Sequence, residues 1–303
     1  MFDRIIKGTP EDDILKGKGL KDDILGLDGN DTLKGFKGND RLNGGEGSDD
    51  LFGGGGKDLL VASKGGDFHN GGSGFDTVTY IKADVGVTVQ MNLSGGYGYG
   101  WAAHHTFESI EQVKGSNFND TIGGYKTDIT IRGGKGDDYV YGGSGNDKVF
   151  GGVGADSVSG GLGNDLVKGD KGNDTVRGGD GNDRLFGGAG DDTLQGEGGD
   201  DLLKGGNGND TLQVGTGDDE MWGNAGFDSF IFYSTWGTAT VKDFDDAEND
   251  NIQFSGTSLV DFNDLLDHTR TVAGNAVIAL DDGTVVIEGL TKAMLHDDMF
   301  FIF

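Results

Sequence analysis

The sequence of 303 residues contains no cysteine, little basic charge and no long apolar run. Without cysteine, neither disulfides nor thiolate metal sites can order the chain. Only 24 Lys and Arg residues stand against 52 Asp and Glu residues, which gives a formal net charge of −28. This balance argues against nucleic acid or an anionic membrane as a partner, since both require basic patches, and favours a cation. No apolar run approaches the roughly 18 residues of a membrane span.

Glycine is the residue in excess, with 62 copies, where an average globular protein has roughly 7%. Such a content indicates low complexity unless a strict period accompanies it. The first eight residues, from Met1 to Gly8, lack the apolar core of a cleaved signal peptide, so we expect none.

A strict period of nine residues accompanies the glycine. From Gly115 to Ile231 the chain divides without a gap into 13 units, such as GGSGNDKVF at 142–150. The sixth position is Asp in 12 of these units, with Ile129 as the exception, and the eighth position is apolar in all 13. Residues 26–79 give six more units, and residues 8–25 give two looser ones. The aspartates assigned to this pattern are Asp13, Asp23, Asp31, Asp40, Asp49, Asp58, Asp67, Asp76, Asp120, Asp138, Asp147, Asp156, Asp165, Asp174, Asp183, Asp192, Asp201, Asp210, Asp219 and Asp228.

The pattern G-G-x-G-x-D-x-U-x resembles the RTX (repeats-in-toxin, hemolysin-type calcium-binding) family. The resemblance implies an all-β fold, a right-handed parallel β-roll. Glycines at the first, second and fourth positions allow a tight turn, and the closing x-U-x predicts a three-residue strand with its middle side chain inward. Two units then make one turn of 18 residues, with strands on two opposed sheets.

Stacking brings the Asp of one unit above that of the second unit along, about 4.8 Å away. Each bare pair would repel by roughly 3–4 kcal/mol at an effective dielectric constant near 20. Ca²⁺ suits this row because it accepts six to eight oxygens in flexible geometry. The alternative is that these aspartates only form turns, but their sustained register favours several calcium ions. One apolar residue in nine buries little surface, so we expect the chain to be disordered without metal.

Residues 80–114 interrupt the repeats but are expected to stay stacked on the roll, with strands at 85–93 and 109–113. The intervening loop, 95–105, carries aromatic residues and two histidines. It suggests either a sugar or transition-metal site or a covering flap, and we favour the flap. His69 occupies an eighth position, so we interpret it as a core-edge substitution and not as a ligand.

The sequence thus predicts four segments: an N-terminal roll at 1–79, the interruption at 80–114, the main roll at 115–231 and a C-terminal cap at 232–303. In the cap we expect strands at 240–244 and 252–254 around an acidic loop, which is either one more calcium site or a solvated turn. Ser258 is expected to cap a helix at 259–268, and 276–280 and 284–288 to form a hairpin. The end of the chain, DDMFFIF, resembles the uncleaved export signal of RTX proteases and lipases, or is simply a last buried strand. The resemblance implies a type I ABC exporter as a partner and an extracellular or cell-surface location.

Catalytic motifs are missing from the sequence: it has no His-Glu-x-x-His and no Gly-x-Ser-x-Gly, and Gly53–Asp58 lacks the Ser or Thr of a P-loop. We therefore expect no enzyme. The favoured function is a secreted calcium-binding structural, surface or host/matrix interaction protein. The alternative is a polysaccharide-binding module similar to those of alginate epimerases, for which a row of basic residues on one sheet would be the marker. An unrecognised enzyme or a membrane-active toxin is the third hypothesis. The outward basic candidates are Lys148, Lys168, Arg177, Arg184 and Lys204.

Overall fold

The computed structural model describes residues 2–91, 97–100, 102–125, 127–233 and 236–303. It is nearly all β and has the parallel β-roll topology expected from the repeats. The chain divides into two compact units, Met1–Ser144 and Gly145–Phe303. Part of the aromatic loop, residues 95, 96 and 101 and the side chains of 97 and 99, lies outside the described residues. No helix in the part of the chain that the structure describes is long and apolar enough to cross a membrane.

Most strands of the repeats are six residues long or longer, and not three. They cover positions 7 to 9 of one unit and positions 1 to 3 of the next, as in β17 (Lys148–Val153). Two residues of this strand face inward, Val149 at the eighth position and Gly151 at the first. The first glycine is therefore part of a strand and not of the turn, which corrects the expectation from sequence. The turn lies at positions 4 to 6, where Gly154 has a φ of 138°.

The first unit contains strands in three parallel arrays. Within this unit the first array has β1 (Arg4–Lys7), β3 (Asp22–Asp28), β5 (Arg41–Glu46), β7 (Leu59–Val61), β9 (Thr77–Thr79), β13 (Gln112–Lys114) and β15 (Thr130–Lys135). The second has β2 (Ile14–Lys16), β4 (Thr32–Lys37), β6 (Asp50–Gly56), β8 (Phe68–Gly74) and β12 (Thr106–Glu108). The third has β10 (Val87–Gln90), β14 (Thr121–Gly123) and β16 (Tyr139–Ser144), with β11 (Tyr97–Gly100) antiparallel at its edge.

The interruption contributes strands to all three arrays. β12 pairs in parallel with β8, β13 lies between β9 and β15, and β10 pairs with β14. The strand predicted at 85–93 is present as Val87–Gln90, with residues 92 and 93 outside the described residues. The strand predicted at 109–113 begins three residues later, as β13. Ser109 has a φ of 53° there, and this left-handed residue separates β12 from β13. The chain thereby passes from the second array to the first between Glu108 and Gln112.

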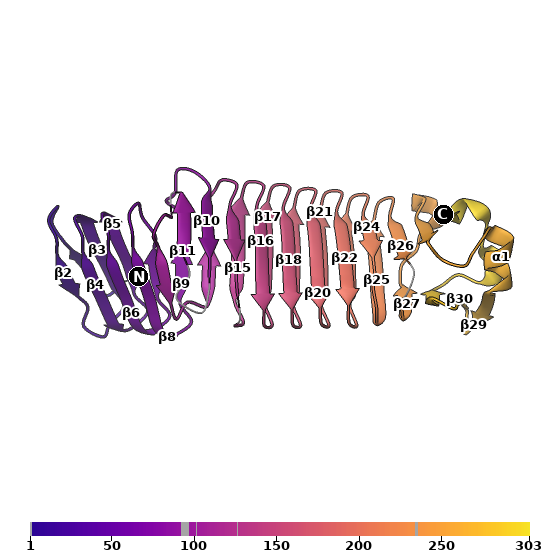
Figure 1. Cartoon of the computed structure of the whole chain (residues 1–303), viewed down its shortest axis with the longest axis horizontal. Coiled ribbons are helices and arrows are strands. Elements are labelled where there is room, and N and C mark those ends of the chain that lie inside the picture. The colour runs from indigo at the N-terminus through magenta and orange to yellow at the C-terminus, as the bar shows by residue number, and fades with distance from the viewer. Residues whose placement is uncertain (1, 92–96, 101, 126, 234–235) are drawn as a thin grey trace. The chain divides into compact units, whose positions relative to one another are not determined.

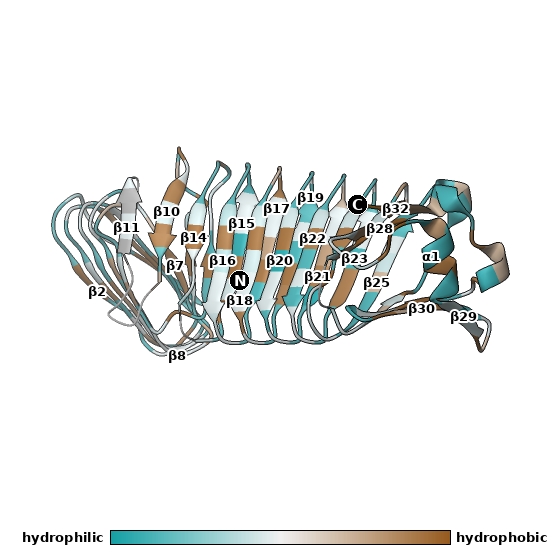
Figure 2. Cartoon of the chain, turned by 45° about the vertical axis from the view of Figure 1, so that its right-hand side comes forward, coloured by the Kyte–Doolittle hydropathy of each residue, from teal (hydrophilic) through white to brown (hydrophobic). Residues whose placement is uncertain are grey.

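In the second unit, successive repeats alternate between two parallel sheets (Figure 1). One sheet has β17, β19 (Leu166–Lys171), β21 (Arg184–Ala189), β23 (Leu202–Asn207), β25 (Asp218–Ala225) and β27 (Thr238–Val241). The other has β18 (Ser157–Leu162), β20 (Thr175–Asp180), β22 (Thr193–Gly198), β24 (Thr211–Gln213), β26 (Ser229–Tyr233), β28 (Asn251–Ser255) and β32 (Phe300–Ile302). Short apolar segments recur on successive strands (Figure 2). They correspond to eighth positions such as Val167, Leu185 and Leu203, which are fully buried.

The last part of the second unit extends both sheets. The predicted hairpin is present as β30 (Asn275–Leu280) and β31 (Gly283–Ile287), joined by the antiparallel β29 (Thr269–Val272). The helix is shorter than predicted: α1 (Phe262–Asp267) begins after Asp261, whose carboxylate accepts the N–H of Asp264, so Ser258 is not the cap. Three 3₁₀ turns complete the segment, η1 (Asp246–Glu248), η2 (Lys292–Met294) and η3 (Asp297–Met299).

Candidate metal centres

The sixth-position aspartates form ladders along the turns of the roll. In each ladder the backbone N–H of one Asp donates to Oδ1 of the Asp 18 residues later, as from Asp174 to Asp192 and from Asp192 to Asp210, both at 2.8 Å. The same bond links Asp183 to Asp201 at 2.9 Å in the other ladder of the second unit. The stacking of every second repeat, predicted from the period, is therefore confirmed within the units.

The second carboxylate oxygen has a different environment. This atom, Oδ2, is buried in most ladder residues and has no hydrogen-bond partner among the described residues. The ladder residues with such an Oδ2 are Asp31, Asp40, Asp49, Asp58, Asp76, Asp174, Asp183, Asp192, Asp201, Asp210, Asp219 and Asp228. A buried carboxylate oxygen without a partner costs free energy, because it has lost its water and gained nothing in return. Repetition of this cost on turn after turn indicates a cation that supplies the missing interaction.

The first glycine of the repeat makes room for this oxygen. A Cβ added at Gly187 would lie 2.3 Å from Oδ2 of Asp192 and 2.7 Å from the carbonyl oxygen of Gly205 in the next turn. A side chain is thus excluded, and carboxylate and carbonyl oxygens gather in the space. An all-oxygen donor set of this kind fits Ca²⁺ and lacks the nitrogen or sulfur ligands that zinc prefers.

Burial raises the pKa of these aspartates because the charged form is poorly solvated. The pKa of Asp183, Asp192 and Asp219 rises to about 7, and that of Asp201 to about 8. Neighbouring carboxylates raise these values further, whereas the accepted backbone N–H lowers them. A divalent cation would reverse both unfavourable contributions, since it stabilises the charged form.

A second, exposed row lies at the fifth position, where the bonds run in the opposite direction. The N–H of Asp200 donates to Oδ1 of Asn182, and that of Asp218 donates to Oδ1 of Asp200. These side chains border an open groove of about 450 Å³, which Asp183, Asp201 and Glu220 also line. The edge of the second unit is therefore strongly acidic beside the buried ladder.

The structure corrects one predicted ladder residue. Asp22, and not Asp23, stands nine residues after Asp13, and its N–H donates to Oδ1 of Asp40 at 2.7 Å. The Asp23 carboxylate instead forms an ion pair with Arg41 at 2.9 Å. Counting nine from Asp13 would have identified Asp22; the adjacent acidic residue concealed the register.

Two acidic residues extend the ladders beyond the predicted set. Oε2 of Glu111 accepts the N–H of Asp76 at 2.7 Å, and Oδ1 of Asp250 accepts the N–H of Asp228 at 2.9 Å. Asp250 belongs to the acidic loop for which the sequence left a calcium site and a solvated turn open. Both residues stand outside the nine-residue count, because the segments before them have other lengths.

Four ladder residues differ from the rest, because their Oδ2 atoms already have protein donors. Asp13 accepts from Thr9, Asp22 from Lys18 and Arg4, Asp67 from Ser63, and Asp120 from Ser116. Each occupies the first or last turn of its ladder of aspartates within the unit. The donors come mainly from the second position of the same repeat, where Ser and Thr hydroxyls replace a glycine.

The comparison with protein families agrees with this arrangement. The family model described as RTX calcium-binding nonapeptide repeat (4 copies) matches residues 17–51, 43–78, 130–158, 159–194 and 195–230, together more than half of the chain. Among solved structures, the extracellular lipase LipA from Serratia marcescens matches with a TM-score of 0.28 and 20% identity. That match covers 63% of this chain and 40% of the lipase chain, so this chain spans less than half of that protein. No curated protein sequence matches. The chain belongs to the RTX calcium-binding nonapeptide repeat family, whose repeats bind several Ca²⁺ ions.

Proposed function

We propose that this protein is secreted and folds outside the cell when calcium binds between the turns of its Asp ladders. The observation that carries the proposal is the row of buried Oδ2 atoms that have no hydrogen-bond partner among the residues described. The ligands would be the predicted ladder aspartates with Asp22 in place of Asp23, and Glu111 and Asp250 would extend the rows. The rows of calcium ions would end at Asp13, Asp22, Asp67 and Asp120, whose Oδ2 atoms already accept hydrogen bonds from protein donors.

Binding energy is folding energy in such a chain. The core receives one apolar side chain per repeat, while the chain must order a backbone with 62 glycines, at roughly 1–2 kcal/mol per residue. The ladder carboxylates add like-charge repulsion until a cation is present. Low cytosolic calcium would then keep the chain unfolded for export, and millimolar external calcium would fold it.

A pair of matched variants tests the ligand assignment. Asp192→Asn removes one charge from the ladder, whereas Asp180→Asn removes one from an exposed position. In calcium titrations followed by circular dichroism, we expect a higher folding midpoint for the first variant and an unchanged midpoint for the second. Equal midpoints for Asp192→Asn and the unmodified protein would contradict the assignment.

Export would proceed through a type I ABC transporter that reads the C-terminal segment. Phe300 of this segment is buried on β32, while Phe303 is 75% exposed. Deletion of residues 297–303 in a strain that carries such a transporter should abolish secretion without lowering synthesis. Retained secretion of the truncated chain would contradict a C-terminal signal.

We further propose a structural, surface or matrix-contact role outside the cell, with binding of an anionic polysaccharide as the alternative. The sheet that contains β17, β19, β21, β23 and β25 supports this alternative through its outward face. Four of the five basic candidates lie on this face, and only Arg177 lies on the other sheet. Its ninth positions alternate between aromatic and basic side chains: Phe150, Lys168, Phe186, Lys204 and Trp222. Nζ of Lys204 lies 4.2 Å from the centroid of the Trp222 ring, and Nζ of Lys168 lies 4.8 Å from that of Phe186.

Such a face offers rings for sugar stacking and ammonium groups for carboxylates. The test is binding to a panel of uronic-acid polymers in calcium, with Lys204→Ala and Trp222→Ala compared with Gln213→Ala on the opposite sheet. The alternative predicts loss of binding in the first two variants and retention in the third. If the unmodified protein bound none of the polymers, the polysaccharide alternative would be refuted and the structural role would stand.

A further inference from the structure

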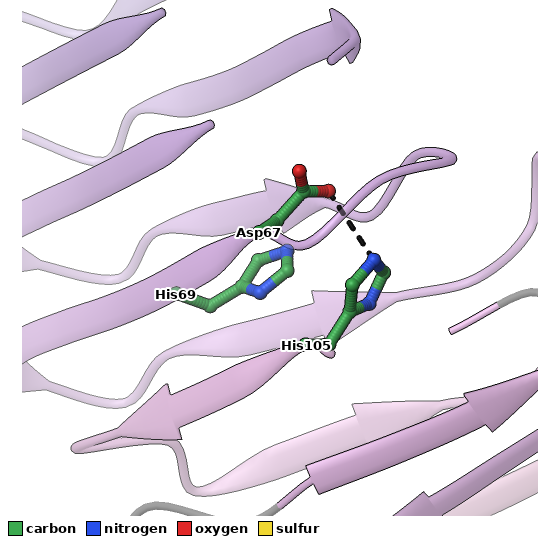
Figure 3. A group of neighbouring side chains, drawn as sticks. All are labelled: Asp67, His69 and His105. Atoms are coloured by element: carbon green, nitrogen blue, oxygen red, sulfur yellow. Dashed lines mark ion pairs between the residues drawn. The ribbon is translucent and has the colours of Figure 1, made fainter. Parts of the chain in front are cut away.

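Three buried side chains that could ligate a metal meet at the end of one ladder of the first unit (Figure 3). Asp67 is the last aspartate of the row that runs through Asp13, Asp31 and Asp49. The pairing of Thr106 with Phe68 places His105 beside Asp67, at the position where another Asp would continue the row. A histidine from the interruption thus replaces the expected carboxylate.

His69 replaces the apolar core residue next to this point. It occupies an eighth position opposite Leu51, and Phe107 of the next strand stacks on its ring with centroids 5.4 Å apart. Its side chain is 0% exposed, and among the described residues only a backbone contact with Thr106 partly satisfies the ring. An imidazole buried in this way costs free energy that Leu would not, and a bound ligand would offset this cost.

The ligand atoms of the three residues converge. One atom from each of Asp67, His69 and His105 lies within 4.8 Å of the others, and Nε2 of His105 lies 3.4 Å from Oδ2 of Asp67. Burial lowers the pKa of His105 to about 4 and that of His69 well below its ordinary value, because the charged imidazolium is poorly solvated there. Neutral imidazole is the form that binds metals.

Tyr80 and Ser63 form hydrogen bonds with two members of this group. The hydroxyl of Tyr80 lies 3.1 Å from Nδ1 of His105, and Oγ of Ser63 donates to Oδ2 of Asp67 at 3.0 Å. Backbone groups of Ser63 and Gly65 also contact the His105 ring and raise its pKa, although burial outweighs them. Metal binding at Nε2 would require Nδ1 to carry the proton and donate to Tyr80. A hydrogen bond on the second nitrogen is the usual way in which a ligating histidine is oriented.

We propose that His69, His105 and Asp67 bind one divalent transition-metal cation of the Zn²⁺ class, separate from the calcium of the ladders. Two neutral nitrogens and one carboxylate oxygen favour Zn²⁺ or Co²⁺ over Ca²⁺, which prefers oxygen alone. The cation would close the ladder at the turn where the Asp row of this array ends. It would also join β8, through His69, to the residue just before β12, His105, which stands 36 residues later in the sequence.

The experiment uses the full chain, folded in excess calcium so that the Asp ladders are saturated. Co²⁺ is titrated as the optical probe and Zn²⁺ is then added as the competitor, with bound metal measured after gel filtration. We expect one equivalent of Co²⁺ with visible absorption bands of a low-coordinate site, displaced by Zn²⁺. Failure of the unmodified protein to bind either ion in excess calcium would overturn the proposal.

Three variants separate the site from the fold. His69→Leu restores the usual residue type of an eighth position, so the roll should form in calcium while the affinity for Co²⁺ falls at least about 100-fold. Tyr80→Phe should weaken binding by about 10- to 100-fold through loss of orientation. His104→Asn changes the adjacent histidine, which is outside the group and has a φ of 68°, a conformation that Asn tolerates, and should bind as the unmodified protein does. Co²⁺ binding by His69→Leu equal to that of the unmodified chain would also overturn the proposal.

Discussion

The sixth-position aspartate contributes to the roll with both of its carboxylate oxygens. Oδ1 of Asp192 accepts the backbone N–H of Asp174 and fixes the register of successive turns. Oδ2 of the same residue is buried against Gly187 and has no hydrogen-bond partner in the part of the chain that the structure describes. One oxygen therefore specifies the stacking, and the other generates the requirement for a cation.

The raised pKa values predict how the calcium-free chain responds to pH. Burial raises the folded-state pKa of Asp183 and Asp219 to about 7, from an ordinary value of 3.8. A group with a raised folded pKa favours folding when protonated, so this stability is fully present below pH 4 and is lost as the pH rises through about 7. In EGTA, the circular dichroism signal of β structure should therefore increase as the pH falls from 8 to 4.5.

A salt control separates the buried groups from the general negative charge. In about 0.5 M KCl the repulsion between exposed carboxylates is screened, whereas buried ones are screened much less. The acid-induced gain in β structure should persist there. If the acid-induced gain in β structure disappeared in salt, its cause would be the net charge and not the buried ladder carboxylates.

Phe36 stands at the second position of a repeat, which is usually a glycine with a positive φ. It occupies that position with a φ of 76° and a side chain that is 50% exposed, whereas Gly54 above it has a φ of 109°. A bulky residue in this region costs about 1–2 kcal/mol. Phe36→Gly should therefore raise the free energy of unfolding in calcium by about 1 kcal/mol, after the greater freedom of glycine in the unfolded chain is subtracted.

Urea unfolding in saturating calcium measures this effect. Phe52→Gly is the control, because Phe52 lies in β6 outside the left-handed region and its ring packs against that of Phe68 at 5.6 Å. The control should shift the midpoint to lower urea. A lower midpoint for Phe36→Gly as well would refute the interpretation of strain.

Each repeat strand from β17 to β23 buries a single apolar side chain, at the eighth position. Leu185 of β21 is 0% exposed, so Leu185→Ala should cost about 2–5 kcal/mol. Leu162, at the third position of a repeat and 52% exposed, is the matched control and should change stability little when replaced by Ala. Urea midpoints in calcium test this pair; equal shifts would mean that the core is not where the stability lies.

The nine-residue period predicted the strands and their order, but not their length. Glycine has no apolar side chain, so no hydrophobic pattern marks that Gly151 is a buried strand residue. The period also placed the Asp ladders, with Asp22 obscured by its acidic neighbour Asp23. His105 and Glu111 could not be placed, because the interruption has no period and their register depends on the pairing of β12 and β13.

In the whole molecule, the ladder of buried Asp carboxylates recurs in both units. Buried ladder oxygens without hydrogen-bond partners among the described residues occur at Asp31, Asp40, Asp49, Asp58 and Asp76 in Met1–Ser144, and from Asp174 to Asp228 in Gly145–Phe303. Calcium dependence should therefore extend over the whole chain and not be confined to one segment. Limited proteolysis should show this directly, with cleavage in both units in EGTA and protection of both in calcium.

Calcium-driven folding is tested by a calcium titration of the purified chain, followed by circular dichroism and hydrodynamic radius, with magnesium as the control ion. We expect an expanded chain with little β structure in excess EGTA. Millimolar calcium should produce a compact β-rich protein, and equal magnesium should not. A chain that is compact and fully β-structured in EGTA, and that does not respond when calcium is restored, would contradict calcium-driven folding.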